Sequence, residues 1–91
     1  MPVTVRIPTI MRTHTGGEKS VTGVGGTVAD VLEDLDSRHG GLADRVVEDG
    51  RLRRFVNVYV NDSDVRFTGG LDTPVTDGDE VTILPAVAGG A

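Results

Sequence analysis

The sequence has no cysteine and no long apolar run. Without cysteine there can be no disulfide, no thiolate nucleophile and no cysteine-ligated metal, and we expect a cytoplasmic protein on the same ground. No apolar run approaches the length needed to cross a membrane. The first residues also lack the basic and apolar regions of a signal peptide. We therefore expect no membrane partner.

Positive charge is scarce as well. Nine Lys and Arg stand against fourteen Asp and Glu, which gives a formal net charge of −5. A protein that binds duplex nucleic acid normally gathers Lys and Arg on one face. Here the only basic cluster is Arg51, Arg53 and Arg54. We expect no nucleic-acid partner, and the acidic surface suits docking on basic protein partners.

The length of 91 residues allows one domain with one core. We expect this domain to occupy residues 1–85 and a flexible C-terminal tail to occupy residues 86–91, ending Gly-Gly-Ala. The tail has no side chain larger than valine, so it can be threaded into a narrow channel of another protein. Its two glycines allow another backbone or a nucleotide to approach closely.

Alternating apolar and polar residues predict the strands. The expected strands are Val3–Ile7, Glu18–Val24, Phe55–Asn61, a short edge strand Val65–Phe67, and Glu80–Leu84. Gly23 interrupts the second of these. Met11–Gly17 is expected to be a loop, because Thr15-Gly16-Gly17 is a turn signal.

One segment predicts a helix. Thr27 begins it with the spacing of a capping box, and Gly40 or Gly41 ends it. Apolar residues fall at i, i+3, i+4 and i+7 on one face; they are Val28, Val31, Leu32 and Leu35. Asp34 falls on the solvated side, so its replacement by alanine is expected to be nearly silent.

A hairpin, one helix and two or three further strands predict an α+β fold. The first and last strands are both strongly apolar, so we expect them side by side and parallel in the middle of the sheet. The predicted architecture is a β-grasp (ubiquitin-like) fold, with a mixed sheet of four to five strands and one main helix packed across it.

The sequence shows no catalytic equipment in this domain. The acidic clusters at 62–64 and 77–80 lack the spacing of a calcium loop and are typical of turns. His14 and His39 are far apart, and neither has a neighbour that suggests a catalytic pair or a metal site. We expect no enzyme activity, no catalytic residue, no bound metal and no bound cofactor.

The stretch from Asp77 to Gly90 resembles the ThiS/MoaD family of ubiquitin-like sulfur carriers. It joins a Gly-Asp-Glu turn, an apolar strand, a proline and a Gly-Gly pair in the register of that family. Further stretches resemble its CysO-type branch, which serves cysteine biosynthesis. They are Ile7-Pro8-Thr9, Thr15-Gly16-Gly17, the strand at 55–62, and the segment 64–71.

The resemblance implies a β-grasp fold and a chemical cycle. Gly90, preceded by Gly89, would be the sulfur-carrying C-terminus. A ubiquitin-activating-like adenylating enzyme would use ATP to adenylate its carboxylate, and a sulfur donor would then displace AMP to leave a thiocarboxylate. The acceptor would be a PLP-dependent cysteine synthase.

Ala91 departs from the family pattern, because with it attached the carboxyl group of Gly90 is held in an amide. The resemblance implies a processing site between Gly90 and Ala91, cut by a JAMM-type metallopeptidase. The alternative is that Ala91 does not belong to the natural chain.

Partner binding is expected on the outward face of the last strand and on the tail. The candidates are Leu84, Pro85, Val87 and Tyr59. By alternation Val81 and Ile83 should point inward; the alternative for Leu84 is that it completes the core.

Other functions stay open at this point. The chain could be a modifier joined through Gly90 to lysines, or a sulfur carrier for a thiazole-, molybdopterin- or thiosugar-forming enzyme. It could also be a β-grasp binding module with an inert tail.

Overall fold

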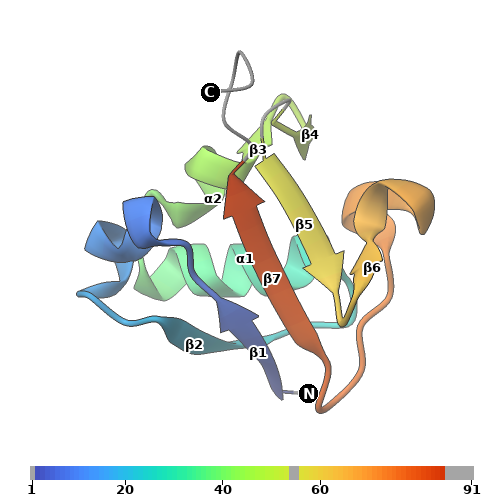
Figure 1. Ribbon diagram of the computed structural model, residues 1–91, viewed down its shortest axis with the longest axis horizontal. Helices are drawn as coiled ribbons and strands as arrows, with labels where there is room; N and C mark the ends of the chain where they lie inside the picture. The colour runs from blue at the N-terminus through green and yellow to red at the C-terminus, as the bar shows by residue number, and fades with distance from the viewer. Residues whose placement is uncertain (1, 54–55, 86–91) are drawn as a thin grey trace.

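The computed structural model describes residues 2–53 and 56–85. Its elements (Figure 1), with η for a 3-10 helix, are β1 (Pro2–Arg6), η1 (Thr9–Thr15), β2 (Ser20–Val24), α1 (Val28–Arg38), α2 (Leu42–Val46), β3 (Val47–Glu48), β4 (Arg51–Leu52), β5 (Val56–Val60), β6 (Ser63–Asp64), η2 (Val65–Phe67), η3 (Gly70–Asp72) and β7 (Glu80–Pro85). The predicted tail at 86–91 lies outside the described residues, so the domain boundary at residue 85 stays a prediction. No helix in the described part is long and apolar enough to cross a membrane.

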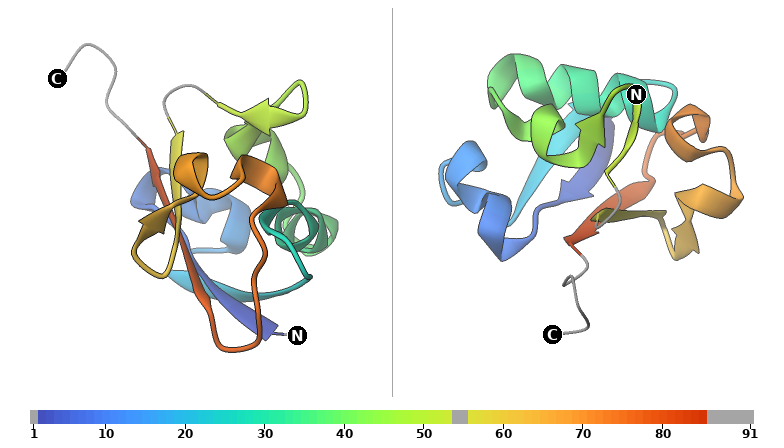
Figure 2. Two further views of the ribbon diagram at one scale, coloured as in Figure 1. Left: turned by 90° about the vertical axis from the view of Figure 1, so that its right-hand side faces the viewer. Right: turned by 90° about the horizontal axis from the view of Figure 1, so that it is seen from above.

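Five strands form one mixed sheet in the order β2-β1-β7-β5-β6. The first and last strands, β1 and β7, lie side by side and parallel, with Val5 opposite Val81. All other pairs in the sheet are antiparallel. The helix α1 crosses one face of this sheet, and β3 and β4 form a separate small hairpin (Figures 1 and 2). The predicted β-grasp fold is confirmed.

The core lies between the sheet and α1. Every second residue of β1 and β7 points into it, and Val3, Val5 and Val81 are fully buried. The predicted apolar face of α1 supplies the other side, with all four of its members buried. The helix begins as predicted, because the Thr27 hydroxyl accepts a hydrogen bond from the Asp30 N–H at 3.2 Å.

Gly23 permits the close approach of α1 to β2. A Cβ atom at this position would lie 2.7 Å from Cγ1 of Val31, and one at Gly25 would lie 2.6 Å from Cβ of Asp30. Both distances are too short for a side chain to fit without movement. The glycine that interrupts the predicted strand therefore serves helix packing.

Two side chains of α1 cover the open edge of β2, which is the outermost strand on that side. Arg38 Nη2 donates to the Thr22 carbonyl oxygen at 2.6 Å, and Asp34 Oδ2 accepts from the Val24 N–H at 2.9 Å. Arg38 and Asp34 also pair with each other at 2.6 Å. They occupy backbone groups that an added strand would use. The expectation that Asp34→Ala is nearly silent assumed a side chain without partners, and the structure contradicts that assumption.

Residues 11–17 were expected to be a loop, but most of them belong to η1. Met11 is buried at the base of this helix, and so is Thr15 one turn later. The Thr15 hydroxyl lies within hydrogen-bond distance of two carbonyl oxygens, Arg12 O at 3.2 Å and Glu18 O at 3.0 Å, and can donate to either. The turn signal is correct only for the end of the segment, where Gly16 and Gly17 have positive φ.

The predicted edge strand at 65–67 is wrong. The strand is β6, just before it, and Val65–Phe67 forms η2. The Asp64 carboxylate caps this helix by accepting from the Arg66 N–H at 2.9 Å. Arg66 turns toward β5 and donates to the Val56 carbonyl oxygen at 2.7 Å. A side-chain cap and an arginine contact of this kind produce no periodic pattern of apolar residues, so the sequence pattern could not predict this helix.

Leu35→Ala should lower the free energy of unfolding by about 2–5 kcal/mol, because it opens a cavity in a fully buried site. Glu33→Ala is the matched control, since Glu33 is exposed on the same helix. Urea denaturation of both variants measures the effect. Equal losses in the two would contradict the placement of α1.

Asp34→Asn should change how stability depends on pH. The Val24 N–H, and secondly Arg38, hold the pKa of Asp34 below its ordinary value of 3.8, against an opposing effect of burial. A lowered folded-state pKa stabilises the fold above 3.8 and loses this effect as pH falls through the folded value. The variant should therefore be less stable than the native protein at neutral pH, and the difference should close below pH 3.8.

Thermal unfolding between neutral and acidic pH measures the difference in stability between the Asp34→Asn variant and the native protein, with Glu33→Gln as the control. A gap that stays constant down to the lowest pH would show that the Asp34 charge is not responsible.

Candidate functional site

The last described strand, β7, leads directly into the predicted tail. Val81 and Ile83 on β7 are buried, whereas Leu84 is 48% exposed. The predicted alternation is confirmed, and Leu84 does not complete the core. Pro85 is half-buried at the end of the strand, opposite Val56 of β5. The other predicted site residues, Val87, Gly89, Gly90 and Ala91, lie outside the described residues.

Tyr59 and Leu84 come together on the outward face of the sheet. Tyr59 lies opposite Thr82, two residues before Leu84, in the antiparallel pair of β5 and β7. A shallow hollow of about 240 Å³ opens between them, lined by Tyr59, Asn61, Asp62, Thr82 and Leu84. The structure therefore joins two of the predicted partner-binding residues in one surface.

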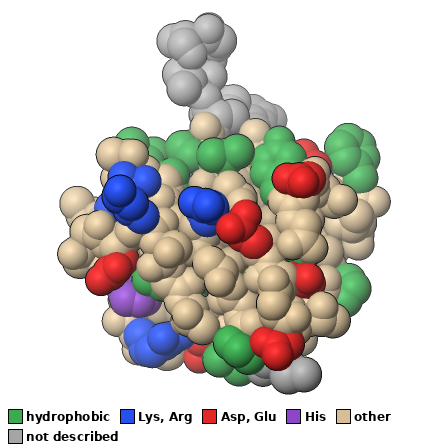
Figure 3. Space-filling model, turned by 60° about the horizontal axis from the view of Figure 1, so that its bottom comes forward, with side chains coloured by type: hydrophobic (Ala, Val, Ile, Leu, Met, Phe, Trp, Pro, Cys, Tyr) green, Lys and Arg blue, Asp and Glu red, His purple; other side chains and the backbone are tan. Residues whose placement is uncertain are grey.

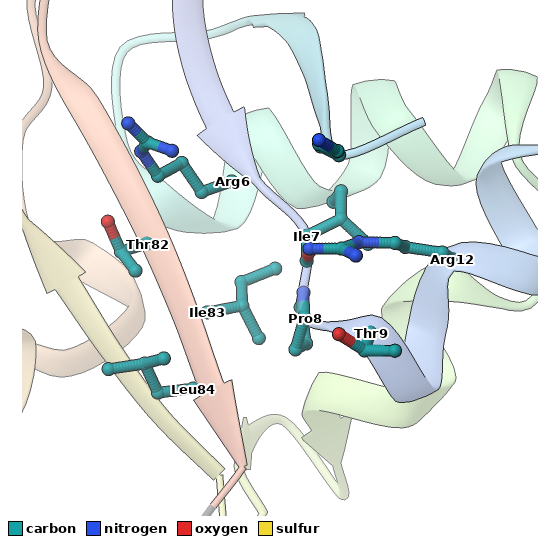
Figure 4. Close-up of a pocket in the computed structure, with 9 residues that line it drawn as sticks. Arg6, Ile7, Pro8, Thr9, Arg12, Thr82, Ile83 and Leu84 are labelled. Carbon is teal, nitrogen blue, oxygen red and sulfur yellow. The ribbon is translucent and has the colours of Figure 1, made fainter. Parts of the chain in front are cut away.

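A second hollow, of about 380 Å³, opens on the other side of Leu84 (Figure 4). We call it the cationic hollow; it is lined by Arg6, Ile7, Pro8, Thr9, Arg12, Lys19, Thr82, Ile83 and Leu84. It forms where β1 and β7 part, since their pairing ends at Arg6 and Thr82. Pro8 has no N–H with which to continue a ladder, and the chain turns into η1.

The sequence analysis did not identify the three cations of the cationic hollow as site residues. Alternation along β1 could have placed Arg6 on the outward face, beside β7. Arg12 and Lys19 carry no such signal, because they lie in and after a 3-10 helix that was expected to be a loop. Arg6 Nε pairs with Glu80 Oε2 at 3.0 Å, and Arg12 Nε donates to the Ile7 carbonyl oxygen at 3.2 Å.

The acidic cluster at 77–80 is a turn, as predicted. Asp79 Oδ2 accepts from the Thr76 N–H at 2.9 Å, and its other oxygen accepts from the Asn61 amide at 3.3 Å. The Thr76 N–H is the main cause that lowers the pKa of Asp79, and Asn61 adds to it. Asn61 in turn accepts from the Glu80 N–H at 3.1 Å. These contacts fix the start of β7 against the end of β5.

His14 is not in an open loop. One ring nitrogen, Nδ1, lies 3.4 Å from the Gly40 carbonyl oxygen, and Nε2 accepts from Arg45 Nε at 3.3 Å. It thereby joins η1 to the connection between the two α-helices. Among residues 2–53 and 56–85, no three His, Asp or Glu side chains are grouped so as to hold a metal ion.

Exposed apolar side chains also lie at the end of the molecule where β7 ends. On the face shown in Figure 3, hydrophobic side chains gather along this upper rim. Lys and Arg lie on the left half and centre of that face, and most Asp and Glu lie to the right and below. Exposed apolar side chains that lie beside localised charges are typical of protein interfaces rather than of a substrate cleft.

Comparison with known proteins agrees with this geometry. The model of the ThiS family matches residues 5–90. The sulfur carrier protein CysO of Mycobacterium tuberculosis is 58% identical, covering 99% of this chain and 100% of the relative. A chain of the Amycolatopsis orientalis BexX/CysO complex is 64% identical with a TM-score of 0.93, covering 97% of this chain and 99% of that chain.

A third relative has a different name. Small archaeal modifier protein 3 of Haloferax volcanii is 45% identical over 64 residues, which cover 70% of each chain. The family match extends through Gly89 and Gly90, and it leaves Ala91 outside. The proteins that this chain is similar to thus include sulfur carriers and a small archaeal modifier.

Leu84→Asp should weaken partner binding without unfolding the domain. The side chain is half exposed on the outward face, and central apolar anchors dominate most interfaces. Binding to the adenylating enzyme that the family resemblance implies should fall by at least about ten-fold, which is the loss of one such anchor. Circular dichroism checks the fold, and Val24→Asp is the control, since Val24 is exposed to a similar degree on the far edge of the sheet. If the Leu84→Asp variant were unfolded, this would contradict the exposed placement of Leu84 and indicate that it belongs to the core.

Proposed function

The chain belongs to the ThiS family, and we propose that it carries sulfur as a thiocarboxylate on Gly90. It is a sulfur carrier protein of the CysO type, and the sulfur serves cysteine biosynthesis. The observation that carries this conclusion is the 58% identity to CysO along the full length of both chains. The sulfur-carrier function expected from the sequence is thereby confirmed, while the role of Gly90 is our proposal.

The proposed cycle follows from the chemistry of a carboxylate. At neutral pH it is an anion and a poor electrophile. A Gly90 carboxylate oxygen attacks the α-phosphorus of ATP, and pyrophosphate leaves. A sulfur nucleophile then displaces AMP, so that the carboxyl carbon holds sulfur. ATP is consumed by a ubiquitin-activating-like enzyme, and the carrier itself contributes substrate rather than catalysis.

The division of labour fits the described residues. The outward face around Leu84 and Tyr59 orients the partner, and β7 aims the residues that follow Pro85. We assign the acceptor role to a PLP-dependent cysteine synthase, because the CysO-type relationship favours that pathway. We place the cycle in the cytoplasm, as the lack of cysteine suggests.

Ala91 requires a processing step. With it attached, the carbonyl carbon of Gly90 is bonded to nitrogen in an amide, so no carboxylate oxygen is present to attack ATP. We propose that a JAMM-type metallopeptidase hydrolyses the Gly90–Ala91 bond before activation. One extra residue would also move the terminal carboxylate by about 3.3–3.6 Å, which is more than an aligned attack tolerates.

A modifier joined through Gly90 to lysines is the second candidate, because one relative is a small archaeal modifier protein. The intact mass of the protein purified from its own cell separates the two. A thiocarboxylate or a cysteinyl adduct supports the carrier. Isopeptide-linked adducts on other proteins support the modifier.

The form ending at Gly90 should support ATP–pyrophosphate exchange by the activating enzyme, and the 91-residue form should not. Adding the peptidase should restore exchange to the longer form. A chain ending at Ala88 is the control that lacks the reactive residue.

Full exchange by uncleaved protein would show that Ala91 is no block. Exchange by neither form would favour an inert-tail module.

A further inference from the structure

We propose that the cationic hollow is a docking pocket for a carboxylate side chain, an aspartate or glutamate that the activating enzyme presents beside an apolar residue. This inference rests on the proposed function, because it takes the face around Leu84 to be what the enzyme covers while it holds the tail. It specifies which type of enzyme side chain enters the cationic hollow.

The charge of the cationic hollow is opposite to that of the whole chain. The formal net charge is −5, yet three of the nine lining residues are cations and none is Asp or Glu. A net charge of this sign favours basic partners in general. At short range, however, the local field decides which side chain is attracted. The partner surface that meets this spot should therefore be acidic.

Two of the three cations are available to a partner. Arg6 already pairs with Glu80. Arg12 uses only its Nε to donate to the Ile7 carbonyl oxygen. The described residues provide no acceptor for its two terminal amino groups or for the Lys19 ammonium. The bond to Ile7 O holds the guanidinium in place over the Ile7–Pro8 segment (Figure 4). A guanidinium held in this way suits a carboxylate, because the two can pair bidentately.

Backbone geometry favours a carboxylate over a phosphate. Phosphate sites are commonly built from several backbone N–H groups that point at the ligand. Here Pro8 has no N–H, and the Ile7 N–H donates to the Lys19 carbonyl oxygen at 2.8 Å. Charge in the cationic hollow comes from side chains alone. The neighbouring apolar surface of Leu84 and Pro8 adds a place for an apolar group beside the acid.

The position of the cationic hollow predicts which kinetic constant responds. Leu84 lines it, and Gly90 comes six positions later in the sequence, a distance of about 20 Å along an extended chain. A carboxylate docked here cannot touch the reacting carbon. Losing the contact should therefore raise the KM for the carrier and leave kcat unchanged.

The test compares Arg12→Glu and Lys19→Glu with the control Arg51→Glu in the form ending at Gly90. All three change the net charge by the same amount, and Arg51 is exposed on β4, away from the cationic hollow. Pyrophosphate exchange at low salt gives KM and kcat. The two hollow variants should raise KM by about ten-fold or more, with a weaker dependence on salt and an unchanged kcat. Arg12→Lys should recover only part of the binding, because lysine keeps the charge but cannot pair bidentately with a carboxylate, and Arg51→Glu should match the native carrier.

Three results overturn the proposal. The first is an unchanged KM in both hollow variants, and the second is an equal rise in Arg51→Glu, which would reflect long-range charge alone. The third is binding of inorganic phosphate in a calorimetric titration that Arg12→Glu abolishes, which would make the hollow an anion site. If the native carrier supports no exchange, the proposed function fails and this proposal with it; if it exchanges and the variants match it, the docking pocket alone fails. Thermal unfolding confirms that each variant is folded.

Discussion

The parallel pairing of β1 and β7 is the constraint on which the rest of the molecule depends. It joins segments from the two ends of the sequence, with Thr4 opposite Glu80 and Val5 opposite Val81. Parallel neighbours need a long crossover, and α1 lies within it. Because β7 is paired with β1 on one side and β5 on the other, the strand that precedes the tail is held at the centre of the sheet. The function that we propose benefits from such a base, because the residues that would react follow this strand in the sequence.

The same pairing shapes the docking face by ending where it does. After Arg6 and Thr82 the two strands part, because Pro8 and η1 draw the chain away. The outward side chains near this point lie around a hollow instead of packing against a neighbouring strand. Leu84 is left half exposed between two hollows, one lined by cations and the other by Tyr59 and Asp62. The surface that we propose for partner binding is thus a consequence of one strand register.

Sequence reasoning recovered the features that depend on periodicity. The apolar face of α1, the alternation along β7 and the parallel central pair were all predicted, because burial imposes a period on residue type. It failed where a single side chain decides the backbone. Thr15 in η1 and Asp64 before η2 each bond to nearby backbone atoms, and such bonds leave no period. Arg12 in the cationic hollow was missed for the same reason. The role of Gly89 and Gly90 stays a prediction from the Gly-Gly motif and the family resemblance, because both residues lie outside the described part of the chain.

The titratable groups with shifted pKa values in the described residues stabilise backbone geometry. A shifted pKa in a cleft usually marks a catalytic group. Here the two resolved shifts, at Asp34 and Asp79, both lower the carboxyl pKa, and in both the largest cause is a backbone N–H. Asp34 covers the edge of β2, and Asp79 closes the turn before β7. Each carboxylate stabilises backbone geometry, and neither lines a hollow on the docking face. Among the described residues, one of these carboxylates therefore holds the edge of β2 and the other fixes the start of β7.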